Sequence, residues 1–153
     1  MGGLFAFQGV QLITHGDDPG RDGSRVPLPW AGTEPPFGFS PAGAAAVPWL
    51  RQPKEWRDLT VAAESASADS MLCLYQNALR IRHSEDALGD APMTWQPSPD
   101  GVLAFDRGTS FRCVTNLSAE PAPLPPHAAA LLASGPLDTG LLPPDTTVWL
   151  RVE

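Results

Sequence analysis

Apolar and polar positions alternate differently along successive stretches of the chain. Residues 1–13, "MGGLFAFQGVQLI", carry closely spaced apolar side chains, which favours one buried strand. From Thr14 to Pro48 almost every residue is glycine, proline, alanine or a short polar residue, with a few isolated aromatic side chains. This composition predicts a long irregular loop, a feature that folded domains usually keep for a function.

Two helices are expected after this loop. In residues 52–65, "QPKEWRDLTVAAES", Pro53 suits a first helical position, and Trp56, Leu59 and Ala63 recur at helical spacing. The following segment, residues 67–90, "SADSMLCLYQNALRIRHSEDALGD", has a broad apolar stripe opposite a polar face. Its candidate N-caps are Ser67, Asp69 and Ser70.

After Gly89 the apolar residues occur in short runs rich in β-branched and aromatic side chains. These runs, "MTW", "VLAFD", "SFRCVTN", "AAALLAS" and "TTVWLRV", are separated by turn-forming residues and therefore predict strands. Gly108 in "FDRGTSF" indicates a hairpin. The fold class expected is α+β, with a small antiparallel β-sandwich or sheet preceded by two helices and a long irregular loop.

Charge and composition exclude several classes of partner. Ten lysines and arginines against 17 aspartates and glutamates give a formal net charge of −7, which argues against a nucleic-acid partner. No apolar run approaches the roughly 18 residues of a membrane-spanning helix, and the N-terminus lacks the features of a signal peptide. We therefore expect a cytoplasmic protein with no membrane partner, no metal and no cofactor. Cys73 and Cys113 are expected to be reduced thiols in a core. Apolar periodic settings likewise predict that Trp56, Trp95 and Trp149 are core residues.

The segment "GRDGSRVPLPW", residues 20–30, combines charge with stiffness. Pro27 and Pro29 restrict the backbone, while nearby glycines permit turns beside Arg21 and Arg25. A guanidinium group held at a fixed point suits a carboxylate or sugar hydroxyls. On composition alone, an Arg–Asp surface turn without a ligand is the preferred interpretation of this segment.

Four segments together resemble the C-terminal third of α-glucosidases in the α-amylase superfamily, glycoside hydrolase family 13. They are "GRDGSRVPLPW", "PPFGFSP", "PWLRQPKEW" and "SMLCLYQNALRIR", in that order. The N-terminal "FAFQGVQL" also resembles the eighth barrel strand of the family, at Gln8 and Gly9, but Val10 and Gln11 stand in place of its acidic pair. The resemblance implies that residues 1–90 are the end of a catalytic barrel and residues 91–153 a C-terminal β-sandwich domain.

The same resemblance implies the roles of three residues. Arg21 would help to bind the terminal glucose of an α-glucoside or oligosaccharide, and Asp22 and Arg25 would shape the loop and the cleft entrance. No catalytic residue is expected in this chain, because the family's nucleophile and acid motifs do not occur in it. A barrel needs about 250 residues and two carboxyl groups about 5 Å apart. Neighbouring acidic residues such as Glu55 and Asp58 are better explained as solvated charge.

Three functional hypotheses follow. The first is a C-terminal part of an α-glucosidase that is inactive alone. The second is a stand-alone β-module that binds carbohydrate or protein through the Arg21 loop and exposed tryptophans, with Trp30 and Trp49 as candidates. The third is one half of a split glycosidase whose partner is an upstream barrel-encoding chain.

Overall fold

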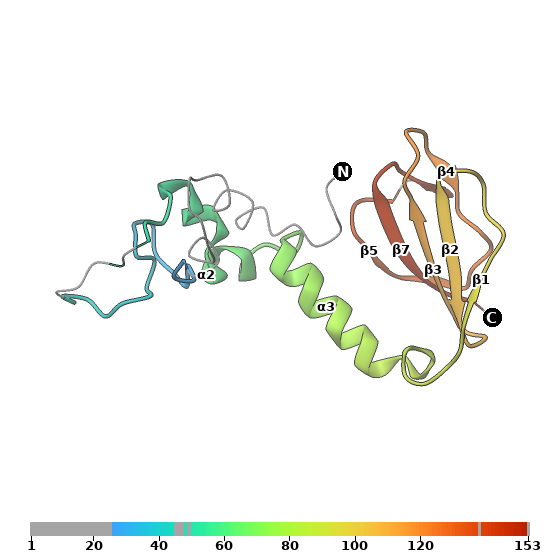
Figure 1. The fold of residues 1–153 in the computed structure, drawn as a ribbon, viewed down its shortest axis with the longest axis horizontal. Coiled ribbons are helices and arrows are strands. Elements are labelled where there is room, and N and C mark those ends of the chain that lie inside the picture. Colours follow the sequence, from blue (N-terminus) through green and yellow to red (C-terminus); the bar gives the residue numbers. More distant parts are fainter. Residues whose placement is uncertain (1–25, 45–47, 49, 138, 153) are drawn as a thin grey trace. The chain divides into compact units, whose positions relative to one another are not determined.

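The computed structural model describes residues 26–44, 48, 50–137 and 139–152 (Figure 1). The predicted strand of residues 1–13 therefore lies outside the described residues. The chain divides between Cys73 and Leu74 into two units, each with its own internal contacts. No helix among the described residues is long and apolar enough to cross a membrane.

The first unit holds the irregular loop and two short helical segments. Residues 26–44 contain no helix or strand, as the composition predicts. The single helix predicted for residues 52–65 is wrong in detail, because it is divided into the 3₁₀ helix η2 (Lys54–Leu59) and the α-helix α2 (Val61–Ser65). Thr60 between them is extended, and its Oγ1 accepts a hydrogen bond from Ala63 N at 3.1 Å. Thr60 therefore caps a new helix instead of continuing the old one.

The helix α3 (Met71–Ser84) begins where the capping candidates predict. Of the three candidates, Ser70 is the residue whose Oγ accepts from Cys73 N, at 3.1 Å, and it donates to the carbonyl oxygen of Glu64 at 2.7 Å. The Glu64 carboxylate accepts from Leu72 N at 3.0 Å. These contacts satisfy free N–H groups of the first helical turn.

The second unit is built on a five-stranded antiparallel sheet, in the order β1-β2-β3-β7-β5 (Figure 1). Its strands are β1 (Met93–Trp95), β2 (Val102–Arg107), β3 (Phe111–Asn116), β5 (Ala129–Ala133) and β7 (Thr146–Arg151). All five apolar runs of the sequence form these strands. The predicted hairpin joins β2 to β3, and Gly108 has a φ of 58°, which a residue with a side chain rarely adopts.

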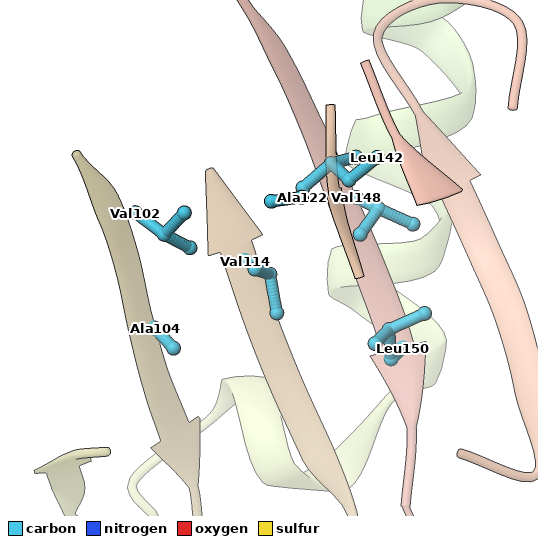
Figure 2. Packing of buried hydrophobic residues seen from close by; sticks show 7 residues of the cluster. All are labelled: Val102, Ala104, Val114, Ala122, Leu142, Val148 and Leu150. Atoms are coloured by element: carbon cyan, nitrogen blue, oxygen red, sulfur yellow. The ribbon is translucent and has the colours of Figure 1, made fainter. Parts of the chain in front are cut away.

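A second, two-stranded sheet of β4 (Ala122–Pro123) and β6 (Leu141–Leu142) covers one face of the larger sheet. The sequence pattern did not predict these strands, because two residues are too few to show an alternation. Ala122 and Leu142 pack with alternate residues of β2, β3 and β7 into one apolar cluster (Figure 2). The remaining members are Val102, Ala104, Val114, Val148 and Leu150.

A second cluster lies on the opposite face of the sheet. There Phe111 and Cys113 pack against Ala87 and Leu88 of the short 3₁₀ helix η3 (Asp86–Leu88) that follows α3. Phe105, Leu131, Trp149 and Ile81 of α3 border the cluster. The sheet thus has an apolar core on each face, as in a small sandwich.

One predicted core residue is exposed. Trp95 keeps 61% of its surface accessible, although its apolar setting suggested burial. It lies on β1, an edge strand that pairs only with β2 among the described strands, and its ring contacts Phe105 at a centroid distance of 5.8 Å. Trp56 is buried, as predicted, and Trp149 is partly buried against Phe111. Both cysteines are free thiols; Cys113 is buried and Cys73 half-buried.

Candidate functional site

The three predicted saccharide-binding residues, Arg21, Asp22 and Arg25, lie outside the described residues. Val26 directly follows them and is the first described residue. The described part of the candidate loop is therefore the segment Val26–Trp30, together with the residues that bind its backbone.

Gln52 holds this segment at Pro27. The side-chain Nε2 of Gln52 donates a hydrogen bond of 2.6 Å to the carbonyl oxygen of Pro27. Gln52 is 7% exposed, so water competes little with the Pro27 carbonyl for its amide hydrogen. The periodicity of the sequence did not single out Gln52, because one polar residue before a proline carries no pattern of its own.

The N-terminus of α2 holds the same segment two residues further on. Val61 N donates to the carbonyl oxygen of Pro29 at 2.9 Å, and Ala62 N donates to that of Trp30 at 3.0 Å. The first N–H groups of a helix have no acceptor within the helix, so the loop supplies the acceptors that they need. The loop and the helix thereby fix each other's position.

Phe37 closes the loop from the other side. Its carbonyl oxygen accepts from both Trp30 N and Ala31 N, at 2.8 and 2.9 Å, and its side chain is completely buried. Phe37 has a φ of 48°, a left-handed conformation that is uncommon for a bulky residue. Such a conformation persists where surrounding contacts hold it, as burial and these hydrogen bonds do here.

The held loop presents apolar side chains to solvent. Trp30 is 48% and Phe39 51% exposed, and Leu28 is also exposed. Lys54 and Glu34 form an exposed ion pair of 3.6 Å. Trp49, the other candidate tryptophan, lies outside the described residues. An exposed aromatic ring on a fixed backbone can stack against a flat apolar surface, including a face of a sugar ring.

Two partly buried acidic residues of the described chain form ion pairs with arginines. Glu85 pairs with Arg151, and Asp106 accepts two hydrogen bonds from Arg112, at 2.6 and 2.9 Å. The hydrogen bond to Asp106 raises the pKa of Arg112 above its ordinary value. Among the described residues no three His, Cys, Asp or Glu side chains gather as a metal site would require.

Known protein families match both parts of the chain. Residues 8–91, more than half of the 153 residues, match the family described as "Alpha amylase, catalytic domain". The chain belongs to the α-amylase family. Residues 100–149 match a second family, "Domain of unknown function (DUF3459)".

Similar members of the α-amylase family include two curated bacterial glucosidases. An alpha-glucosidase of Pediococcus pentosaceus is 36% identical over 81 residues, which are 52% of this chain and 14% of the relative. An oligo-1,6-glucosidase of Heyndrickxia coagulans is 31% identical over 80 residues, with the same coverage. This α-amylase family chain thus spans about a seventh of the length of these relatives.

A solved structure of similar fold is the trehalulose synthase of Pseudomonas mesoacidophila MX-45. It is 27% identical to this chain and superimposes with a TM-score of 0.67 over 87% of the chain and 26% of the synthase. The resemblance to the α-amylase superfamily and the α+β fold class are therefore confirmed.

Proposed function

We propose that this chain forms the end of the catalytic barrel and the β-domain of an α-glucosidase. The observation that carries the proposal is the match of residues 8–91 to the α-amylase catalytic domain, together with relatives that are named glucosidases. The proposed boundary lies between residues 90 and 91, with the barrel end in residues 1–90 and the β-sandwich in residues 91–153. The two separate family matches support this boundary.

The proposal assigns contact with an α-glucoside to Arg21, with Asp22 and Arg25 shaping the loop. A guanidinium group donates several hydrogen bonds in a fixed plane, which suits the adjacent hydroxyl groups of a sugar. The anchoring of Pro27 and Trp30 supports this assignment, because a backbone that is held before the ligand arrives loses less conformational freedom on binding.

The catalytic acids are proposed to lie outside this chain. Hydrolysis with retention needs a nucleophilic carboxylate and a carboxylic acid about 5 Å apart on a rigid frame. The most buried carboxylates with a described ion pair, Glu85 and Asp106, each pair with an arginine, a contact that favours a structural role for both. The chain would therefore contact the substrate only together with the rest of the barrel, and alone it would neither bind an α-glucoside measurably nor cleave it.

Hydrolysis of p-nitrophenyl α-glucoside, with maltose titration calorimetry beside it, tests the proposal. The purified chain is expected to release no nitrophenol and to give no heat with maltose. Release of nitrophenol by the chain alone would overturn the proposal.

A second candidate function is a carbohydrate-binding β-module, which the exposure of Trp95 on the sheet favours. In that case maltose gives heat without hydrolysis, and Trp95→Ala removes the heat. A half of a split glycosidase would instead show hydrolysis only when a chain carrying the upstream barrel is added.

A further inference from the structure

The connection between β1 and β2 contains an aspartate followed directly by a glycine, Asp100 and Gly101. Val102 N donates a hydrogen bond of 3.0 Å to the carbonyl oxygen of Pro99, which closes a β-turn with Asp100 and Gly101 at its centre. Both central residues are exposed to solvent. This pair can react with itself, because the nitrogen of a glycine carries no neighbouring side chain that would hinder its attack on the aspartate.

The fold requires the glycine of this pair. Gly101 has a φ of 79°, and a Cβ added to it would lie 2.9 Å from Ser118 Cβ, which is closer than van der Waals contact allows. The Gly101 carbonyl oxygen also accepts a hydrogen bond of 2.7 Å from Leu117 N. The turn therefore keeps, directly after Asp100, the residue that least hinders a reaction at the aspartate.

We propose that Asp100 is a site of spontaneous isomerisation to isoaspartate, which the folded turn prevents and which opening of the turn permits. In the reaction the Gly101 nitrogen attacks Cγ of the protonated Asp100 side chain. A new N–C bond forms, and the side-chain hydroxyl leaves as water together with the amide proton. Water then opens the resulting succinimide ring at the former backbone carbonyl. The backbone now runs through Cβ and Cγ, the former backbone carbonyl is a free carboxylate, and nothing has been oxidised or reduced.

The class of the turn decides whether the reacting atoms can meet. Gly101 has a positive φ, whereas Asp100 is not among the described residues with one, and this combination is that of a type II turn. In such a turn ψ of the residue at the Asp100 position is about +120°. In an L-residue the following nitrogen approaches the side chain only when ψ has the opposite sign. The folded turn thus holds the Gly101 nitrogen away from Cγ, and ring closure requires local opening.

The test measures isoaspartate in the intact chain after incubation at neutral pH, either folded or in urea, with circular dichroism to follow the fold. Aliquots are digested and treated with an isoaspartyl methyltransferase and labelled S-adenosylmethionine. Peptide mapping separates Asp100 from the other Asp–Gly pair of the chain, Asp22 and Gly23. Label at Asp100 is expected to accumulate at least about tenfold faster in urea, because the folded turn must first open.

Two variants connect this difference to the proposed chemistry and to the turn. Asp100→Glu keeps the charge but lengthens the ring that must close, so residue 100 should stay unlabelled even in urea. Ser98→Ala removes the hydroxyl that donates to the Val102 carbonyl at 2.6 Å, and the rate in the folded chain should rise toward the rate in urea. Ser84→Ala removes a comparable hydroxyl bond at the end of α3 and should leave the rate unchanged.

Equal rates at Asp100 in the folded and the urea-treated chain would overturn the protection by the turn. Absence of label at Asp100 in urea would overturn the site itself. If Ser98→Ala fails to fold, it labels as fast as the urea sample, and the comparison within the unmodified chain decides. This inference does not rest on the proposed function, since neither saccharide binding nor hydrolysis enters the measurement.

Discussion

Asn116 uses both its amide hydrogens and its amide oxygen in the folded chain. Its Nδ2 donates to the carbonyl oxygens of Glu120 and Leu142, at 2.8 and 2.9 Å, and its Oδ1 accepts from the backbone N and the hydroxyl of Ser118. The residue is fully buried at the end of β3. One side chain thus joins the larger sheet, the turn that follows β3 and strand β6.

Asn116→Ala should therefore destabilise the β-domain by about 2–4 kcal/mol, because it leaves the buried Leu142 carbonyl without a donor. Urea denaturation followed by tryptophan fluorescence measures the difference. Asn77→Ala is the control, since Asn77 makes an exposed side-chain hydrogen bond with Arg80, and its cost should stay within about 0.5 kcal/mol. Equal effects of the two substitutions would contradict the role given to Asn116.

Cys113 is a core thiol and not a reactive one. Burial raises its pKa from the ordinary 9.0 to about 11, and hydrogen bonds from Thr115 and Trp149 oppose part of this shift. At about pH 8 only about one folded thiol in a thousand is then ionised, so alkylation by iodoacetamide should be slow until the chain unfolds. Mass spectrometry of the peptide that contains Cys113, with and without urea, measures this. Rapid labelling without urea would refute it.

The same pKa difference predicts a loss of stability at alkaline pH. The folded-state pKa lies above the unfolded one, so the stability due to the neutral thiol is complete below about pH 9 and is lost as pH rises through about 11. Cys113→Val removes this titration. Between these pH values the unfolding free energy of the wild-type chain should therefore fall relative to that of the variant. A difference between the two that stays constant with pH would exclude the effect.

At the scale of elements, α3 depends on a cap that only one of its three candidates provides. Ser70→Ala should cost about 1 kcal/mol, because Cys73 N loses its acceptor and the Glu64 carbonyl loses a donor. Circular dichroism during thermal unfolding measures the change. Ser67→Ala is the matched control, since no side-chain bond of Ser67 contributes to the cap, and the helix should be unaffected. A larger loss for Ser67→Ala would contradict the assignment.

The segment that follows the C-terminal end of α3 forms hydrogen bonds and an ion pair with the sheet. Arg107 donates to the carbonyl oxygens of Gly89 and Ala91, at 2.7 and 3.0 Å, and Arg151 pairs with Glu85 just after the helix. Ala87 lies near Gly108, where an added Cβ would meet Ala91 Cβ at 3.3 Å. The segment after α3 therefore packs against the β2–β3 hairpin without room for a larger residue there.

At the scale of the whole molecule, α3 exposes large apolar side chains to solvent. Met71 and Leu79 of α3 are 45% and 54% exposed, while Leu72 and Tyr75 are half-buried. An exposed apolar face promotes association unless something covers it.

We therefore expect the purified chain to associate as its concentration rises, and Leu79→Glu to reduce this association by placing charge on the face. Sedimentation velocity over a concentration series measures both. Gln76→Glu adds the same charge at another exposed position of α3 and should leave association nearly unchanged. A wild-type chain that stays monomeric at every concentration would contradict this expectation.

The sequence by itself determined the classes of element and the family. Helical spacing predicted α3, and five β-rich runs predicted the five strands of the main sheet, because periodicity and turn residues are local properties. The ordered motifs around "GRDGSRVPLPW" identified the α-amylase superfamily, which the family match confirms.

Tertiary structure alone decided the contacts between distant residues. The break at Thr60 follows from hydrogen bonds between α2 and a loop about thirty residues earlier. The exposure of Trp95 follows from its place on an edge strand. The strands β4 and β6 follow from packing on a sheet already formed. The contact of Gln52 is equally distant, because its amide donates to the Pro27 carbonyl, 25 residues away in sequence. Such pairings depend on which groups the folded chain brings together, and no local pattern encodes them.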